Sequence, residues 1–194
     1  KKMGLPINKL IVATNQNDIL HRAISKGDYE VEKVTKTISP SMDIQIASNF
    51  ERLIYDLNDG DDEKTIIAMR DIKEKGDYKI DQKKLDKIKL NFLSSRMNEE
   101  EVLKNIKLVY EKFDIVLDPH SAIGYGAFDI VNLNGNNIVL ATAHPCKFPE
   151  AIKNSINLKA NIPDELSFIM GEKEKYDIID NNVGKVKQYI KERI

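Results

Sequence analysis

The sequence predicts an α/β protein in which short parallel strands alternate with helices. Three apolar runs support this fold class: residues 10–14 (LIVAT), 115–117 (IVL) and 138–142 (IVLAT). Each run is continuous, which is typical of a strand buried on both faces of a parallel sheet. A polar or proline-containing turn and then a helical pattern follow each run, and this repeated order indicates parallel α/β architecture.

Between the first and second predicted strands we expect a helical insertion at about 48–113. Capping residues, glycine stops and apolar stripes define its helices. The four helices are predicted at 48–57, 65–74, 81–92 and 98–113. The charged faces of these helices are interpreted as solvated scaffold.

The last third of the chain carries further helix signals. Pro149 suits the first position of one helix, and Pro163 opens another that ends near Gly171. Residues 176–179 are predicted to form an edge strand, and the apolar spacing after residue 183 indicates a terminal helix.

Composition bounds the class of protein. The 194 residues are 41% hydrophobic and 31% charged, which suits one globular region over residues 1–194. The net charge of -1 gives no electrostatic footprint for nucleic acid or an anionic membrane, and no apolar run approaches the ~20 residues of a membrane-spanning helix. Cys146 is the only cysteine, so we expect a reducing compartment, the cytoplasm. The sequence leaves the oligomeric state open.

Polar residues follow the predicted strands, where parallel sheets bind ligands. The loops concerned are 14–18, 118–121 and 142–147. The spacing of His120, His144 and Cys146 matches no zinc signature, so we predict no metal site. A Ser-His-Asp triad within 118–121 is excluded because those residues share one turn.

Several residues allow two interpretations. Asp118-Pro119-His120 is either a helix cap, a first-turn proline and a surface histidine, or part of a site. Cys146 is either a nucleophile or a small buried residue. Arg52 forms a surface ion pair or binds an anion, and Gly124–Ala127 (GYGA) indicates close helix packing more than phosphate binding.

Taken in order, the motifs resemble a known family. They are KMGLP at 2–6, LIVATNQNDIL at 10–20, SPSMDI at 39–44, SNFERL at 48–53, DPHSA at 118–122 and TAHPCKFPEA at 142–151. This succession is similar to the carboxy-terminal part of threonine synthase of the long bacterial and fungal type, in register to about residue 156. Residues 48–52 (SNFER) and 142–145 (TAHP) are its most specific motifs.

The resemblance implies a tryptophan-synthase-β-like fold (fold type II) and the cofactor pyridoxal 5'-phosphate. The implied enzyme is a lyase that converts O-phospho-L-homoserine and water to L-threonine and phosphate, with the cofactor as electron sink. In the family, a Schiff-base lysine and a Gly/Asn-rich phosphate loop precede the matched part. We therefore expect that this chain contains no catalytic residue and depends on a missing amino-terminal part. We expect the chain alone to be inactive.

The resemblance also assigns site residues. Thr142 corresponds to the residue that faces the pyridine nitrogen of the cofactor, where a hydroxyl can donate to an unprotonated ring. The other expected cleft residues are Asn15, Asp18, Ser48, Asn49, Arg52, His144 and Lys147, of which Arg52 and Lys147 are the candidates to meet a substrate phosphate. Cys146 and Ser121 stand where the family more often has Ala and Thr. The alternatives are a sister phospholyase with the same cofactor, or a non-catalytic module that binds phosphate or an amino acid.

Overall fold

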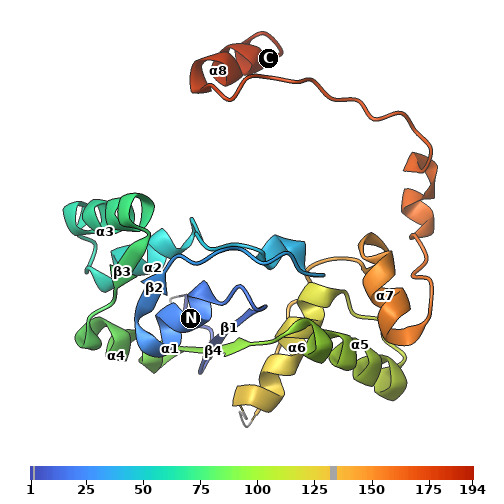
Figure 1. Ribbon diagram of the computed structural model, residues 1–194, viewed down its shortest axis with the longest axis horizontal. Helices are drawn as coiled ribbons and strands as arrows, with labels where there is room; N and C mark the ends of the chain where they lie inside the picture. Colours follow the sequence, from blue (N-terminus) through green and yellow to red (C-terminus); the bar gives the residue numbers. More distant parts are fainter. Residues whose placement is uncertain (2, 132–134) are drawn as a thin grey trace. The chain divides into compact units, whose positions relative to one another are not determined.

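The computed structural model describes residues 1, 3–131 and 135–194, which divide into two compact units (Figure 1). The larger unit spans Lys1–Ala160 and the smaller one Asn161–Ile194. Both units are defined only by contacts among these residues. The expectation that residues 1–194 belong to one globular region therefore stays a prediction. The predicted helices of the smaller unit are confirmed as the 3-10 helix η3 (Asp164–Ile169) and the α-helix α8 (Val183–Lys191).

Helices make up most of the larger unit. Its α-helices are α1 (Ile19–Lys26), α2 (Phe50–Leu57), α3 (Asp62–Lys75), α4 (Gln82–Asn91), α5 (Glu99–Phe113), α6 (Pro119–Val131) and α7 (Pro149–Ile156), and its 3-10 helices are η1 (Pro40–Met42) and η2 (Pro145–Lys147). Asp81 caps α4 as predicted, since its side chain accepts a hydrogen bond from the backbone of Lys84. Asn98 and Glu101 form the predicted capping box of α5. The helical insertion is therefore confirmed, and two strands described below interrupt it.

The predicted strand at residues 10–14 is confirmed as β1 (Leu10–Thr14). It pairs in parallel with β4 (Phe92–Arg96), and Thr14 lies opposite Arg96. The sequence had placed Phe92 on a helix, and this was wrong because Phe92 has extended backbone angles that end α4. Pairing with a distant strand overrides the helical spacing of the preceding apolar residues.

A second, antiparallel pair lies at the edge of the helical insertion. β2 (Asp28–Glu30) pairs with β3 (Asp77–Lys79), and each strand follows a glycine that ends a helix. Gly27 has φ of +76°, and a Cβ on it would come within 2.7 Å of the carbonyl oxygen of Ile80. These three-residue strands were not predicted because they are too short to show a period.

The other predicted strands differ in the structure. Residues 115–117, 138–142 and 176–179 form no ladder with any residue that the structure describes. A strand exists only where a neighbouring strand offers matching backbone groups. Ile138 and Leu140 are 87% and 76% exposed, so this apolar run lies uncovered in the chain.

Two apolar cores stabilise the larger unit. The first joins α1 to α4 around Ile19, Ile54 and Ile72, each at most 1% exposed. The second joins α5, α6 and α7 around Ile106 and Ile152, both fully buried. Burial of an isoleucine side chain contributes about 1.5–3 kcal/mol. The second core lies beneath α6 and the loop that leads into α7, where the site described below is built.

Close packing of α5 and α6 explains the small residues at 124–127. A Cβ on Gly126 would lie 2.1 Å from both the side-chain nitrogen of Asn105 and the terminal methyl of Met97. The prediction of close helix packing at this stretch is therefore confirmed.

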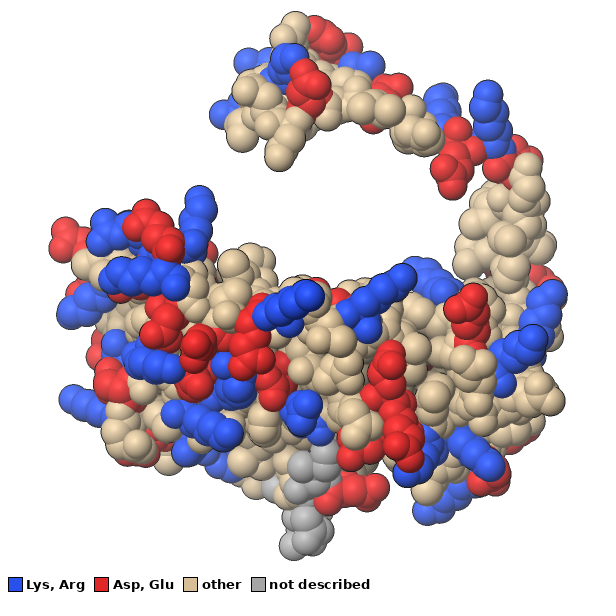
Figure 2. Space-filling view, viewed as in Figure 1, with Lys and Arg blue, Asp and Glu red and all other residues tan. Residues whose placement is uncertain are grey.

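Acidic and basic side chains are interspersed over the face of the larger unit shown in Figure 2. This mixture agrees with the near-zero net charge of the sequence. Across the parts of the chain that the structure describes, every helix is too short or too polar to cross a bilayer.

Candidate functional site

The loop after β1 is held by a buried network of amides and hydroxyls. The side-chain nitrogen of Asn15 donates to the hydroxyl of Ser39 at 3.0 Å and to a carboxylate oxygen of Asp43 at 2.8 Å. Asn17 donates to the same oxygen of Asp43 at 2.9 Å. Asn15 is 2% exposed, and its carbonyl oxygen accepts the backbone N–H of Asn17. The structure therefore places the predicted site residue Asn15 behind the strand end, where it anchors the segment before and after η1.

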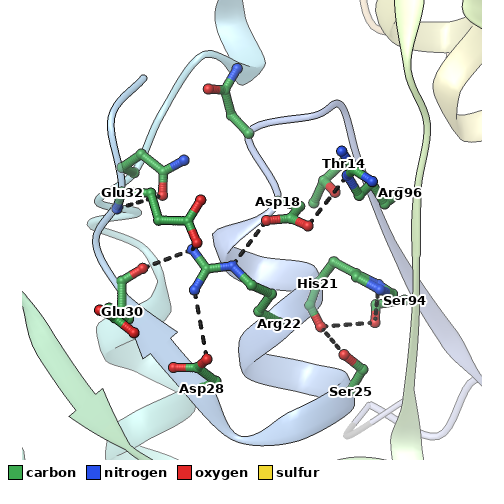
Figure 3. A network of polar contacts seen from close by, with 12 residues as sticks. Thr14, Asp18, His21, Arg22, Ser25, Asp28, Glu30, Glu32, Ser94 and Arg96 are labelled. Carbon is green, nitrogen blue, oxygen red and sulfur yellow. Dashed lines mark hydrogen bonds and ion pairs between the residues drawn. The ribbon is translucent and has the colours of Figure 1, made fainter. Parts of the chain in front are cut away.

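Asp18 joins two arginines at the carboxyl end of the parallel sheet (Figure 3). One of its oxygens lies 2.9 Å from Nε of Arg22, and the other lies 3.3 Å from Nε of Arg96. The guanidinium of Arg22 also meets Asp28 at 3.9 Å and Glu32 at 3.5 Å. The Arg22 side chain is 10% exposed, so its charge is compensated almost entirely by protein groups.

His21 lies beside this cluster and contacts β4 (Figure 3). Its Nδ1 is 3.0 Å from the hydroxyl of Ser94. Burial lowers the pKa of His21 below its ordinary value, and the nearby Asp18 carboxylate opposes this effect without overcoming it. His21 is therefore a neutral polar link between α1 and the sheet near pH 7.

Asp118 caps α6 and gathers donors on both of its carboxylate oxygens. One oxygen accepts the backbone N–H of His120 at 2.9 Å and that of Ser121 at 3.4 Å. The same oxygen lies 2.9 Å from Nδ1 of His120, and the other accepts the hydroxyl of Ser121. The cap and the first-turn Pro119 are confirmed, and Asp118 is 1% exposed.

The contacts of His120 fix its tautomer. Its Nε2 accepts the backbone N–H of Ser41 at 3.2 Å, so this nitrogen carries no proton. Nδ1 therefore carries the proton and donates to Asp118. The ring of His120 also packs on Phe148 with centroids 4.9 Å apart. The interpretation of His120 as a surface residue is wrong, because only 5% of it is exposed.

Burial by itself would raise the pKa of Asp118. The hydrogen bonds from the His120 ring, the Ser121 hydroxyl and the two backbone amides outweigh burial and hold the pKa of Asp118 below its ordinary value. Asp118 is therefore a buried carboxylate that stays ionised near neutral pH.

Thr142 contacts this cluster from the other side. Its backbone N–H donates to the hydroxyl oxygen of Ser121 at 3.1 Å, and its own hydroxyl lies 3.4 Å from that oxygen. Thr142 is exposed, whereas Ser121 is 2% exposed. The arrangement joins α6 to the apolar run at 138–142 and presents a threonine hydroxyl at the surface of this unit.

The two remaining site candidates of this loop lie at η2. His144 caps η2, since its Nδ1 accepts the backbone N–H of Cys146 at 3.2 Å. Lys147 is exposed, and its side chain makes no hydrogen bond or ion pair with the residues that the structure describes. Cys146 is a free thiol of intermediate exposure, so it is not the fully buried cysteine of the alternative interpretation.

The candidates at the start of α2 are exposed. Ser48, Asn49 and Arg52 all lie at the surface, and Asn49 caps α2 without a side-chain hydrogen bond. Arg52 forms no ion pair with the described part of the chain, which leaves its guanidinium available to an anion. A shallow groove between α2 and α3 includes Arg52 and is also lined by Glu51, Tyr55, Asp56, Asp62, Thr65 and Ile66.

The structure thus brings together only some of the predicted residues. Asn15 and Asp18 lie at the end of β1, Arg52 lies on the exposed face of α2, and Thr142 lies against α6. Asp118, His120 and Ser121 were not counted among the site residues. The sequence did contain a signal for them, because an acid, a histidine and a serine stand directly after an apolar run. Only the fold shows that Thr142 contacts this cluster through Ser121.

Comparison with known proteins identifies relatives along the whole chain. A family model described as "Threonine synthase, C-terminal" matches residues 121–190. The threonine synthase of Pseudomonas aeruginosa is 36% identical over 98% of this chain, and that of Saccharomyces cerevisiae is 38% identical over all of it. The chain spans about two fifths of the length of these relatives, with shares of 41% and 43%.

A solved structure shares the fold. The threonine synthase from Brucella melitensis, crystallised with bound pyridoxal phosphate, superposes with a TM-score of 0.86 and 40% identity. The match covers 98% of this chain and 41% of that one.

Proposed function

We propose that the chain belongs to the threonine synthase family and forms the carboxy-terminal part of a threonine synthase. The proposed enzyme is a pyridoxal-phosphate-dependent lyase that converts O-phospho-L-homoserine and water to L-threonine and phosphate. The observation that carries this proposal is the match to a cofactor-bound threonine synthase over nearly the whole chain. The lysine that binds the cofactor and the loop that binds its phosphate belong, on this proposal, to the rest of the polypeptide.

The residues of this chain fit one side of a pyridoxal phosphate pocket. Thr142 offers an exposed hydroxyl on a main chain that Ser121 holds in place. A hydroxyl suits an unprotonated pyridine nitrogen, because it can donate a hydrogen bond without the negative charge that favours a pyridinium. The cofactor, when bound, supplies the electron sink for carbanion chemistry. Thr142 orients the ring.

We propose that the exposed polar residues face the substrate. Arg52 and Lys147 lack ion-pair partners in the described chain, and both can meet the phosphate of O-phosphohomoserine. Ser48, Asn49 and His144 lie three or four residues from these cations and are proposed to line the same cleft. Asn15 and Asp18 are proposed to support the cleft wall, because their side chains are bound to other protein groups.

The partner of this chain is proposed to be the remainder of its own polypeptide, and the small-molecule partner is O-phosphohomoserine. The cytoplasm is the proposed compartment, which agrees with the single free cysteine.

The test uses the full-length protein. We expect cofactor absorbance in the visible range and phosphate release from O-phosphohomoserine, and we expect neither from residues 1–194 alone. A full-length protein without bound cofactor would overturn the proposal. A protein that binds the cofactor but releases phosphate only from another phosphorylated amino alcohol would identify the sister phospholyase instead.

A further inference from the structure

The buried Asp118–Ser121 pair lies directly behind Thr142, and cofactor binding by Thr142 alone does not explain it. Asp118 and Ser121 are both at most 2% exposed. A buried carboxylate is costly unless donors surround it, so this one requires a structural reason. Among the described residues, the only hydroxyl hydrogen-bonded to Asp118 is that of Ser121, and Ser121 is the only side chain hydrogen-bonded to Thr142.

Counting protons fixes the direction of each hydrogen bond. A serine hydroxyl has one proton, and Ser121 gives it to Asp118. The oxygen of Ser121 is therefore an acceptor toward Thr142, and it takes the backbone N–H at 3.1 Å. Ser121 has no proton left for the Thr142 hydroxyl, 3.4 Å away.

His120 keeps Asp118 in this state. Its unprotonated Nε2 accepts from Ser41, so Nδ1 donates to one oxygen of Asp118 while the backbone of α6 donates to the same oxygen. The second oxygen is left for Ser121. The direction of each of these hydrogen bonds is thus fixed, and Ser121, which lies on helix α6, holds the main chain at Thr142.

The Thr142 hydroxyl keeps its own proton available. A separation of 3.4 Å is long for a bond between hydroxyls, which usually lie about 2.7–2.8 Å apart. The hydroxyl proton can therefore rotate toward a better acceptor without a large loss of hydrogen-bond energy.

We propose that Asp118 and Ser121 are positioning residues for Thr142: they hold its main chain through Ser121 and leave its hydroxyl free to donate to the ring nitrogen of the cofactor. This inference rests on the proposed function. It assigns the two residues no contact with the cofactor or the substrate. The serine oxygen is the required group, so Ser121→Thr, which keeps a hydroxyl, is the conservative replacement.

The experiment uses the full-length protein loaded with pyridoxal phosphate labelled with ¹⁵N in the ring. Thr142→Val provides the reference change in the ring-nitrogen chemical shift. We expect Ser121→Ala to move this shift in the same direction and to lower kcat about three- to tenfold, the effect of one lost hydrogen bond. Ser121→Thr should restore both readouts.

Asn98→Ala is the matched control, because it removes a helix cap of α5 and should leave the ring-nitrogen shift unchanged. If Ser121→Ala does not fold, Ser121→Cys replaces it, since a thiol is a weaker acceptor of similar size. An unchanged shift in a folded Ser121 variant, beside a clear change in Thr142→Val, would overturn the positioning role. Absence of bound cofactor in the unmodified protein would instead overturn the proposed function.

Discussion

Asp118 shows how one buried residue makes stability depend on pH. Its pKa in the folded protein lies below the ordinary value of 3.8, so its carboxylate is stabilised by folding. The contribution is complete above that value and is lost as the pH falls through the lower folded pKa. The direction follows from the donors of His120 and Ser121, which favour the charged form.

We therefore expect Asp118→Asn to destabilise the full-length protein at pH 7 and to do so progressively less below about pH 4. Urea unfolding at several pH values measures this convergence. Asp129→Asn changes an exposed aspartate on the same helix and is the matched control. A difference between Asp118→Asn and the unmodified protein that stays constant down to pH 3 would contradict the prediction.

Arg22 is a second residue whose surroundings determine how much its substitution changes the stability of the fold. Its charge is nearly buried and faces Asp18, Asp28 and Glu32. Removal of the guanidinium leaves carboxylates without their main partner, so Arg22→Met should lower the free energy of unfolding by about 3 kcal/mol. Thermal unfolding of the variant checks this value, and Arg70→Met, at an exposed position of α3, provides the comparison. Equal losses in both variants would show that burial of the charge does not matter.

At the scale of the element, the close contact between α5 and α6 depends on Gly126, which has no side chain. Gly126→Ala would force a Cβ against Asn105 and Met97, and we expect a loss of about 1–3 kcal/mol from overpacking. Gly124→Ala, whose Cβ would lie 3.3 Å from a methyl of Val139, should change stability by less than about 1 kcal/mol. The difference in melting temperature between the two variants is the measurement. A more stable Gly126→Ala would mean that the two helices are not tightly packed.

The elements also show what a sequence can and cannot reveal. Helices marked by local capping groups, such as α4 and α5, were predictable because the cap and the helix lie within a few residues. β4 was not, because its strand identity comes from pairing with β1, far away in the chain. The assignment of Thr142 to the site comes from the resemblance and stays a prediction, and the burial of His120 depends on Ser41 and Phe148, which lie far from it in the sequence. Contacts between distant segments leave no local periodicity to read.

At the scale of the whole molecule, the apolar run at residues 138–142 lies exposed and suits pairing with a further strand. Ile138 and Leu140 are largely exposed, although a continuous apolar run of this kind is typical of a buried strand. The chain covers 41% of the length of the Pseudomonas aeruginosa relative, and under the proposed function the remainder of the polypeptide is the partner of this run. Under that proposal, the run becomes a paired strand that ends at Thr142, and the pairing places the threonine hydroxyl at the edge of the proposed cofactor pocket.

Hydrogen exchange tests this expectation directly. The backbone amides of residues 138–141 should exchange quickly in residues 1–194 alone and at least about a hundredfold more slowly in the full-length protein, since a paired strand opens only with its sheet. The amides of β1 residues, already paired with β4, provide the internal reference. Equally fast exchange of residues 138–141 in both proteins would mean that the run stays unpaired. Thr142 would then rely on the Ser121 contact alone for its position, and the effect of Ser121→Ala on cofactor binding should be correspondingly larger.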